Sequence, residues 1–337
     1  MMTPAILVHG GAGAMRGMTA EREARYRAGL RSATTAGRAV LQAGGTPLDA
    51  CIAAMVNMED GGVFNAGLGS CLTSAGTVEM DAAVMRGSDR AMGAVAGVAH
   101  LANPILAARA VMDHTPHSLL AADGALAFAE AQGLTRRPDF PPAHRRAEWT
   151  RKRAKLEARA AGKSLEQGLA ELGGVLGEQE DDPHHDNHDT VGAVAIDADG
   201  RIAAAVTTGG IWLKMPGRVG DSPLPGAGFW AVDGHGACVA TGTGESLMRV
   251  MICHEATHFM RRGDDAQTAC DAAVALLEQE CGPNQGGLIA IDPAGRLGWA
   301  INTNGMGRGA WIAGMAEPAI AVWPDEDWDR PLAPSGR

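Results

Sequence analysis

The chain has little positive charge. Its 337 residues contain 29 lysines and arginines against 39 aspartates and glutamates, which gives a formal net charge of −10 at pH 7. Proteins that bind nucleic acid usually carry basic surface, so this balance argues against a nucleic-acid partner. We expect a small-molecule partner instead.

Long apolar runs are also missing. No stretch approaches the length of a membrane span, and the first residues contain neither a basic leader nor an apolar run of signal-peptide length. We therefore expect a cytoplasmic protein with no membrane partner. The six cysteines lie far apart, and none forms a Cys-x-x-Cys pair. In a reducing compartment this spacing predicts buried free thiols rather than disulfides or zinc ligands.

The remaining composition is that of a globular protein. Hydrophobic residues make up 46% of the chain and charged residues 20%, and the length suffices to bury a sizeable core. Helical patterns occupy residues 20–42, 46–58, 103–113, 119–131, 245–259 and 265–279. Strand patterns occupy residues 5–9, 78–85, 91–99, 226–232, 236–240, 288–291, 297–302 and 319–323, with a further hairpin around the turn at 197–200. Paired strands and paired helices without βαβ crossovers predict an α+β fold of antiparallel sheets covered by helices.

Residues 140–189 differ from the rest of the chain. Residues 145–176 are rich in Arg, Lys, Glu, Ala and Leu, which predicts solvated helix, and an acidic, histidine-rich tract then ends at Asp189. We interpret this segment as a surface excursion or linker within a single domain that spans residues 1–337.

The acidic tract runs directly into an apolar segment that begins at Thr190. Threonine often starts a strand, because β-branched side chains suit extended backbone. The same residue becomes a self-contained catalyst if the bond before it is broken, since its new α-amine can act as base for its own hydroxyl. The junction alone favours the first interpretation, and the motifs that follow favour the second.

Three motifs rich in glycine follow in order: Thr207-Thr208-Gly209-Gly210, Gly217-Arg218-Val219-Gly220-Asp221 and Thr241-Gly242-Thr243-Gly244-Glu245. Three others precede them: His9-Gly-Gly-Ala-Gly-Ala14, Phe64-Asn-Ala-Gly-Leu-Gly69 and Glu79-Met-Asp81. Together they resemble the threonine-dependent N-terminal nucleophile (Ntn) hydrolases, specifically plant-type asparaginase/isoaspartyl peptidase and the related glycosylasparaginase. The likeness extends over most of the chain, and its strength lies in the order and spacing of the motifs. It implies a four-layer αββα sandwich.

The resemblance implies that the precursor cuts its own chain between Asp189 and Thr190, which gives an α chain of residues 1–189 and a β chain of residues 190–337. Thr190 would then be the nucleophile, and Thr208 would orient its hydroxyl. A free α-amine has a pKa of roughly 7.7–8.0, so near neutral pH a useful fraction accepts the hydroxyl proton.

The remaining matching residues are implied to hold the substrate and the developing charge. Thr241 and Gly242 match the oxyanion hole, and Asn65 matches the position beside it. Arg218 would bind the substrate α-carboxylate through two charge-assisted hydrogen bonds, and Asp221 would accept the α-ammonium. The substrate is then asparagine or a β-aspartyl peptide, and the product is aspartate.

Two departures leave the leaving group open. Most asparaginase-like members have glycine before the nucleophile, whereas the His188-Asp189-Thr190 junction is more like glycosylasparaginase, so N-glycosylasparagine remains an alternative substrate. In addition, Gly307 stands where relatives often have tyrosine. The resemblance also implies a homodimer of αβ units and no catalytic cofactor, and it suggests a structural sodium ion held by carbonyl groups of the loop just before Phe64.

An alternative from another mechanistic class is a zinc peptidase. His254-Glu255-Ala-Thr-His258 is a literal H-E-x-x-H in a helical segment, with Glu278 as a third ligand. The asparaginase interpretation places a helix without metal at this position.

A further alternative is a binding module that keeps the pocket and never cleaves itself. A flexible tract such as the one formed by His184, His185, Asp186, His188 and Asp189 typically binds metal only adventitiously. The Gly10–Gly13 turn does not fit a dinucleotide-binding motif, because Arg16 stands where that motif requires glycine.

Overall fold

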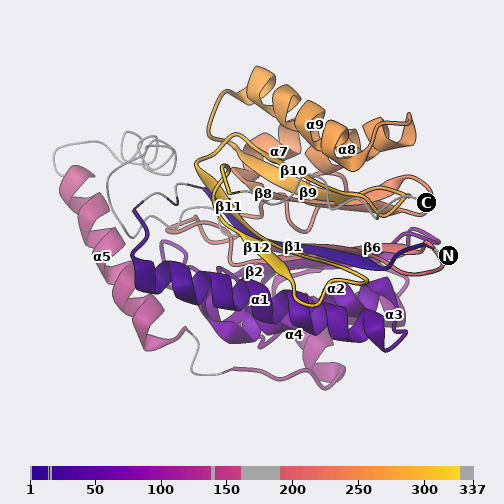
Figure 1. The fold of residues 1–337 in the computed structure, drawn as a ribbon. Helices are drawn as coiled ribbons and strands as arrows, with labels where there is room; N and C mark the ends of the chain where they lie inside the picture. Colours follow the sequence, from indigo (N-terminus) through magenta and orange to yellow (C-terminus); the bar gives the residue numbers. More distant parts are fainter. Residues whose placement is uncertain (1, 14, 16, 138–140, 161–189, 327–337) are drawn as a thin grey trace.

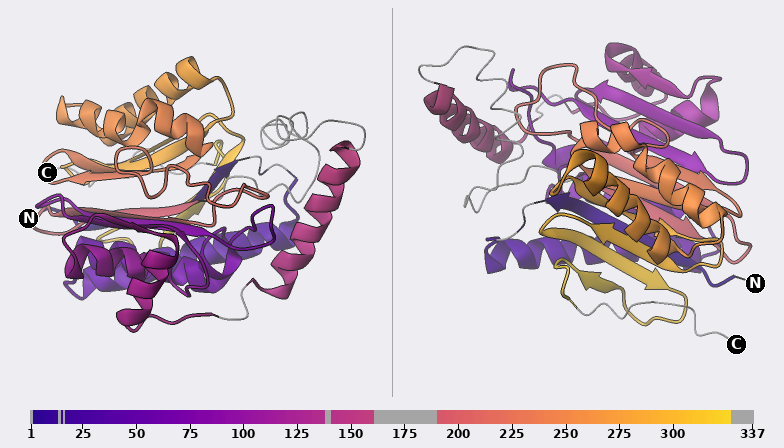
Figure 2. Two further views of the ribbon diagram at one scale, coloured as in Figure 1. Left: turned by 180° about the vertical axis from the view of Figure 1, so that it is seen from behind. Right: turned by 90° about the horizontal axis from the view of Figure 1, so that it is seen from above.

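The computed structural model describes residues 2–13, 15, 17–137, 141–160 and 190–326. These residues form four layers, in which two sheets lie face to face and helices cover both outer surfaces (Figures 1 and 2). The expected α+β fold with an αββα order of layers is confirmed.

The larger sheet has eight strands in the order β12-β11-β1-β5-β6-β2-β3-β4. Its strands are β1 (Ala5–Gly13), β2 (Met80–Arg86), β3 (Met92–Val98), β4 (Leu119–Ala121), β5 (Val191–Ile196), β6 (Ile202–Thr208), β11 (Gly305–Ile312) and β12 (Ala319–Ala321). All neighbouring pairs are antiparallel except β3 and β4, which are parallel. Strands from both ends of the chain therefore meet in one sheet.

The smaller sheet has four antiparallel strands in the order β10-β9-β8-β7. They are β7 (Phe229–Val232), β8 (Gly236–Gly242), β9 (Gly286–Ile291) and β10 (Leu297–Ile301). Helices α7 (Gly244–Val250), α8 (Ile252–Arg261) and α9 (Ala266–Cys281) cover its outer face (Figure 1). The chain between β8 and β9 thus forms one complete helical layer.

The outer face of the larger sheet is covered by α1 (Ala20–Gln42), α2 (Pro47–Gly61), α3 (Pro104–His114) and α4 (Ala122–Ala131). The start of α2 follows from its sequence, because the Thr46 hydroxyl accepts a hydrogen bond from the Asp49 amide and proline occupies the first turn. Gly62, with φ of 65°, ends the same helix.

Each pair of neighbouring layers encloses its own hydrophobic core, and the alternation of side chains along the strands explains why. In β1, Ile6 and Val8 pack against the helices, whereas Ala5 and Leu7 face the second sheet. In β8, Val239 faces the first sheet and Cys238 faces α8 and α9. Because side chains of a strand alternate between its faces, a strand covered on both sides reads as a continuous apolar run.

Two expectations about elements were wrong, and one strand was not anticipated. The helix expected over 245–259 is two helices, because Met251 adopts a left-handed backbone with φ of 50° between α7 and α8. The helix expected over 119–131 begins only at Ala122, after the short strand β4. No strand was expected over 305–312, where β11 lies in the interior of the larger sheet.

Helix α5 (Ala143–Ala160) lies at one edge of the sandwich, within the segment expected to be helical and solvated (Figures 1 and 2). Trp149 attaches it, donating from its indole nitrogen to the carbonyl of Thr73 at 2.8 Å. Residues 161–189 lie outside the described part of the chain, so the division into α and β chains remains a prediction.

Two further expectations concern composition. The six cysteines are free thiols, and five of them are buried. Among the described helices, none combines the length and the apolarity that a bilayer crossing requires.

Candidate active site

Thr190 and Thr208 lie side by side in the larger sheet, where the start of β5 meets the end of β6. Strands β5 and β6 are antiparallel, with Val191 opposite Thr207, so the start of β5 meets the end of β6. The Thr190 hydroxyl donates to the Thr208 hydroxyl at 3.1 Å, and both residues are buried. The alternation of side chains places Thr190 on the face that carries Val194 and Ile196, which is the face between the two sheets.

His9 lies on the same inner face beside the start of β5. It pairs with Gly192 across β1 and β5, and a Cβ at Gly192 would lie 2.5 Å from the imidazole Nε2. Burial lowers the pKa of His9 to about 3, and contact with the Thr190 main chain only partly offsets this effect. The imidazole is therefore neutral at physiological pH and fills the space next to Thr190 without adding charge.

Thr241 reaches the same region from the smaller sheet. It is the last residue but one of β8, and its hydroxyl oxygen accepts a hydrogen bond from the Ala12 amide at 3.1 Å. Ala12 belongs to an irregular part of β1, where the pairing with β11 shifts register between His9 and Ala12. This hydrogen bond joins the two sheets at the edge that carries Thr190.

Gly242 has a backbone that only glycine adopts readily, with φ of 146°. A Cβ at this position would overlap the carbonyl oxygen of Gln285. The following residue, Thr243, donates its amide to the same carbonyl at 2.7 Å. The end of β8 therefore lies tightly against the start of β9 (Gly286–Ile291), and the turn toward α7 has a fixed course.

Asn65 is buried below the turn that follows Thr208. Its side-chain nitrogen donates to the carbonyl of Gly210 at 2.6 Å, and its side-chain oxygen accepts from the Cys71 amide at 2.8 Å. The Gly209 amide donates to the Asn65 carbonyl at 2.9 Å. Asn65 thus connects the 64–71 loop to the turn after Thr208, a contribution that the motif alone did not reveal.

Arg218 forms a two-point ion pair with Glu245. The Arg218 Nε and Nη2 donate to the two carboxylate oxygens at 2.9 and 2.8 Å. Gly220 and Gly244 border the other side of the guanidinium, where a Cβ would lie 2.7 Å from Nη1 and 2.9 Å from Nη2 respectively. The edge formed by Nη1 and Nη2 therefore faces two residues without side chains.

Asp221 lies beside Arg218 and is buried, with 3% of its surface exposed. Burial raises its pKa to about 7, and the charge of Arg218 acts in the opposite direction. Its Oδ2 has no hydrogen-bond partner among the described residues. A buried carboxylate oxygen without a donor is costly, so this atom is well placed to accept a hydrogen bond from a bound cationic group.

The Glu79-Met-Asp81 motif supports the loop that carries Arg218. The Glu79 carboxylate accepts from the Gly217 amide at 2.7 Å, and its carbonyl accepts from the Lys214 ammonium at 2.7 Å. Asp81, paired with Thr208 across β2 and β6, is fully buried, and burial raises its pKa. The motif therefore lies beneath the candidate site and supports it.

The structure explains the glycine at position 307. This residue belongs to β11 next to the irregular part of β1, and a Cβ there would overlap the ring of Tyr26 from α1. The Tyr26 hydroxyl donates to the Gly10 carbonyl at 2.7 Å, and its ring lies 5.0 Å from that of Phe64. Tyr26, the only tyrosine of the chain, thus occupies the space next to Gly307.

The H-E-x-x-H motif lies on α8, away from these residues. His254 and His258 stack with ring centroids 6.4 Å apart, and Glu255 lies 3.4 Å from the His254 Nδ1. Within the described ranges, no group of three or more His, Cys, Asp or Glu side chains is placed to hold a metal ion, so Glu278 does not complete the proposed set. The zinc interpretation therefore lacks a third ligand there.

The sequence motifs identified the main residues of the candidate site but not the residues that contact them. The structure brings Thr190, Thr208 and Thr241 to the same edge of the sandwich and places Arg218 next to Asp221. It adds contacts made by His9, Glu245 and Tyr26, the first two of which were quoted only as parts of motifs. Asp189 and the histidine-rich tract lie outside the described residues.

Comparison with known proteins agrees with these motifs. The family described as asparaginase matches residues 2–319. A plant-type L-asparaginase of Pyrococcus furiosus is 42% identical over 320 residues, which cover 94% of this chain and 99% of that protein. An isoaspartyl peptidase of Escherichia coli K12 is 40% identical over 322 residues, covering 94% and 95% of the two chains. An isoaspartyl peptidase/L-asparaginase of Xenopus laevis is 38% identical over 312 residues, covering 93% and 92%.

The match spans both sheets and both helical layers, and its identity is high over nearly the whole length of each relative. The four-layer fold and the order of the motifs agree with it. The chain therefore belongs to the asparaginase family of Ntn hydrolases, alongside plant-type L-asparaginases and isoaspartyl peptidases.

Proposed function

We propose that the chain is a self-processing threonine amidohydrolase that hydrolyses the side-chain amide of L-asparagine and of β-aspartyl peptides and releases L-aspartate. The names of the relatives support this substrate class, since they include L-asparaginase and isoaspartyl peptidase. The single observation that carries the mechanism is the 3.1 Å hydrogen bond between the Thr190 and Thr208 hydroxyls at the inner edge of the sheets.

The first step of the proposal is cleavage of the chain. The Thr190 hydroxyl attacks the carbonyl carbon of Asp189, the C–N bond breaks, and the acyl group moves from nitrogen to oxygen. Water then hydrolyses the ester, which releases the Asp189 carboxylate and leaves Thr190 with a free α-amine and a free hydroxyl. That amine is the base for the catalytic cycle.

In the cycle, Thr190 attacks the side-chain amide carbon of the substrate. The α-amine takes the hydroxyl proton and passes it to the leaving amine, so that ammonia or an amino acid departs and an acyl-enzyme remains. Water then attacks this ester and releases aspartate. Thr208 positions the nucleophile, and Thr241 with Gly242 supplies donors to the oxyanion, which is the group that gains charge in the transition state.

Recognition of the free amino-acid end is assigned to Arg218 and Asp221. The Nη edge of Arg218 is bordered by glycines, which leaves room for a carboxylate to approach both nitrogens. The unpartnered Oδ2 of Asp221 would accept the α-ammonium. A substrate with both groups satisfies both residues.

Mass measurement of the Thr190→Ala variant tests the proposal. We expect wild-type protein to separate into chains of residues 1–189 and 190–337 under denaturing conditions, and the variant to remain intact and inactive. Cleavage of the variant at the same bond would overturn the self-processing scheme. An intact but fully active wild-type chain would instead favour another nucleophile. Glu255→Gln is the control for the zinc alternative, and it should keep full activity.

The preferred leaving group is settled by comparing turnover of L-asparagine, a β-aspartyl dipeptide and N-glycosylasparagine. Gly307 and Tyr26 pack together in the core between the larger sheet and its helices, so this contact does not decide among the three substrates.

Three further assignments belong to this proposal. We propose a homodimer of αβ units, as the family resemblance implies, and a cytoplasmic location, which the six free thiols support. A structural sodium ion would be held by main-chain carbonyls of the loop just before Phe64, since a hard cation prefers oxygen ligands.

A further inference from the structure

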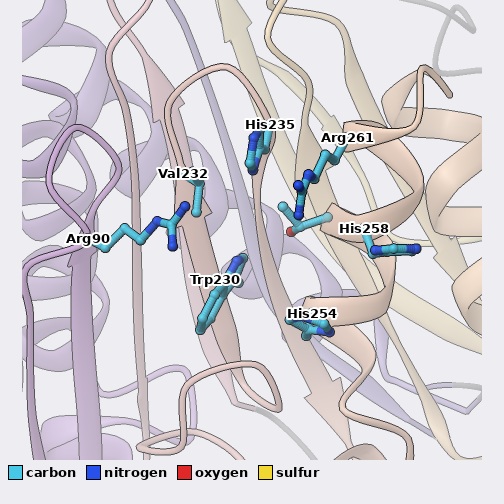
Figure 3. A pocket seen from close by; sticks show the side chains of 8 residues that line it. Arg90, Trp230, Val232, His235, His254, His258 and Arg261 are labelled. Atoms are coloured by element: carbon cyan, nitrogen blue, oxygen red, sulfur yellow. The ribbon is translucent and has the colours of Figure 1, made fainter.

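A hollow of about 120 Å³ lies on the smaller sheet, between β7, α8 and two turns. Its lining consists of Arg90, Trp230, Val232, His235, His254, Thr257, His258 and Arg261 (Figure 3). Two of these residues are arginines, three are histidines and none is acidic. In a chain with a net charge of −10, this is a local concentration of positive and proton-accepting groups.

The two arginines approach the hollow from different elements. Arg90 extends from the turn between β2 and β3, and Arg261 extends from the end of α8, toward the space above Trp230 (Figure 3). Neither forms an ion pair with a carboxylate of the described residues. The nearby Asp89 is held by Arg86 at 2.7 Å, and Glu255 lies beside His254. Two cationic groups therefore face the same space without a counter-charge in the lining.

The backbone at Arg90 supports a binding role. Its φ is 59°, a left-handed conformation that glycine or asparagine adopts more easily than arginine. His235 lies between the two arginines, and their positive charges affect its pKa. Burial lowers the pKa of His235, and the charges of Arg261 and then Arg90 lower it further. Strain and unbalanced charge at one place are features that bound ligands commonly offset.

The dipole of α8 does not by itself explain why these basic residues gather around the hollow. Basic residues in the last turn of a helix are stabilised by its dipole, which accounts for His258 and Arg261. It does not account for Arg90 or His235, which come from two separate turns. A metal ion is also a poor occupant, because two guanidinium groups would repel it.

The hollow is separate from the Thr190 region. His235 immediately precedes β8, whereas Thr241 and Gly242 end the same strand. A strand rises about 3.3 Å per residue, so the two regions lie about 20 Å apart along β8. A ligand in the hollow would not touch the catalytic threonines.

We propose that this hollow binds a phosphate group, either as inorganic phosphate or as the phosphate of a small monoester. Arg90 and Arg261 donate to its oxygens from opposite sides, since guanidinium groups match phosphate geometry. The imidazole group of His235, which lies between the two arginines, adds a further donor (Figure 3). Trp230, whose ring meets that of His254 edge-on at 5.6 Å, provides an apolar wall for an attached organic group.

Calorimetric titration of the mature enzyme with inorganic phosphate, AMP and adenosine tests this proposal. We expect one saturable site per αβ unit for phosphate or AMP, and Arg90→Gln or Arg261→Gln should weaken binding by about tenfold or more, as expected for loss of a charge-assisted hydrogen bond. Tighter binding of AMP than of phosphate identifies a monoester as the ligand, and equal binding identifies the phosphate group alone.

Arg262→Gln is the matched control, because Arg262 is an exposed neighbour that does not line the hollow. It should bind phosphate as the wild type does. All three substituted arginines are exposed, and circular dichroism with thermal unfolding confirms that each variant is folded. The proposal is overturned if no ligand binds saturably, if adenosine binds as well as AMP, or if the three variants lose affinity equally. Because these readouts need no substrate, they are independent of the proposed activity.

Discussion

Arg218 has two hydrogen-bonding edges, and Glu245 occupies one of them. The Nε–Nη2 edge meets the Glu245 carboxylate, while the Nη1–Nη2 edge lies between Gly220 and Gly244. A guanidinium on a flexible side chain loses less conformational freedom on binding when another group already fixes its orientation. Glu245 is thus a positioning residue for Arg218, the arginine proposed to bind the substrate carboxylate.

This arrangement predicts the effect of Glu245→Gln. The substitution keeps the shape of the side chain and removes its charge, so Arg218 should be held less firmly. We expect KM for asparagine to rise by about tenfold with little change in kcat, the size expected for a charge-assisted hydrogen bond. Steady-state kinetics measures both constants, and Glu278→Gln on exposed α9 surface is the control. An unchanged KM in Glu245→Gln would remove this role.

Asp221 predicts a pH dependence of binding. Its pKa is raised to about 7, so the carboxyl is increasingly protonated as the pH falls from 8 to 6 and its attraction for an ammonium group declines. The inhibition constant of the product L-aspartate should therefore rise toward low pH, and it reports binding without the chemical step. In Asp221→Asn the constant should be high and nearly independent of pH. A flat profile in the wild type would contradict the assignment.

At the scale of elements, α1 fixes the irregular end of β1 through one side chain. Tyr26 donates to the Gly10 carbonyl, and its ring fills the space beside Gly307 of β11. Two residues further along β1, the Ala12 amide bonds to Thr241. Helix α1, strands β1 and β11 and Thr241 are thereby coupled through a short segment of backbone.

Two substitutions test this coupling. Tyr26→Phe removes one buried hydrogen bond and should lower the free energy of unfolding by about 1 kcal/mol. Gly307→Ala forces a methyl group against the ring and should cost about 1–3 kcal/mol. Urea denaturation measures both in the uncleaved Thr190→Ala background. Gly124→Ala is the control, because a Cβ there meets nothing within 4 Å. If Gly307→Ala proves as harmless as the control, the packing argument is wrong.

Local signals explain which elements were predictable. The helix predicted from residue 46 begins with Thr46 as its N-cap followed by proline, and the strands predicted around 197–200 and over 288–291 and 297–302 form the hairpins β5–β6 and β9–β10. Strand β11 was missed because Gly305, Gly307 and Gly309 weaken its strand character. The break at Met251 was missed because no glycine or proline marks it.

For the whole molecule, sequence patterns predicted antiparallel sheets covered by helices, and the family resemblance implied the four layers, but neither predicted the strand order. Pairing of β1 with both β5 and β11 joins residues separated by most of the chain, and no local pattern encodes such contacts. The candidate site shows the same division. The motifs named Thr190, Thr208, Arg218 and Asp221, whereas the partnership of Arg218 with Glu245 and the burial of His9 beside Thr190 arise only from tertiary packing.

The interior position of β5 matters most once the bond before Thr190 is cut. This strand is flanked by β1 on one side and β6 on the other, so the new end of the polypeptide emerges already held within a continuous ladder of main-chain hydrogen bonds. Severing the covalent link would leave two interlocked pieces, and neither would depart without the larger sheet coming apart. The proposed cleavage before Thr190 would therefore leave the shape of the fold intact.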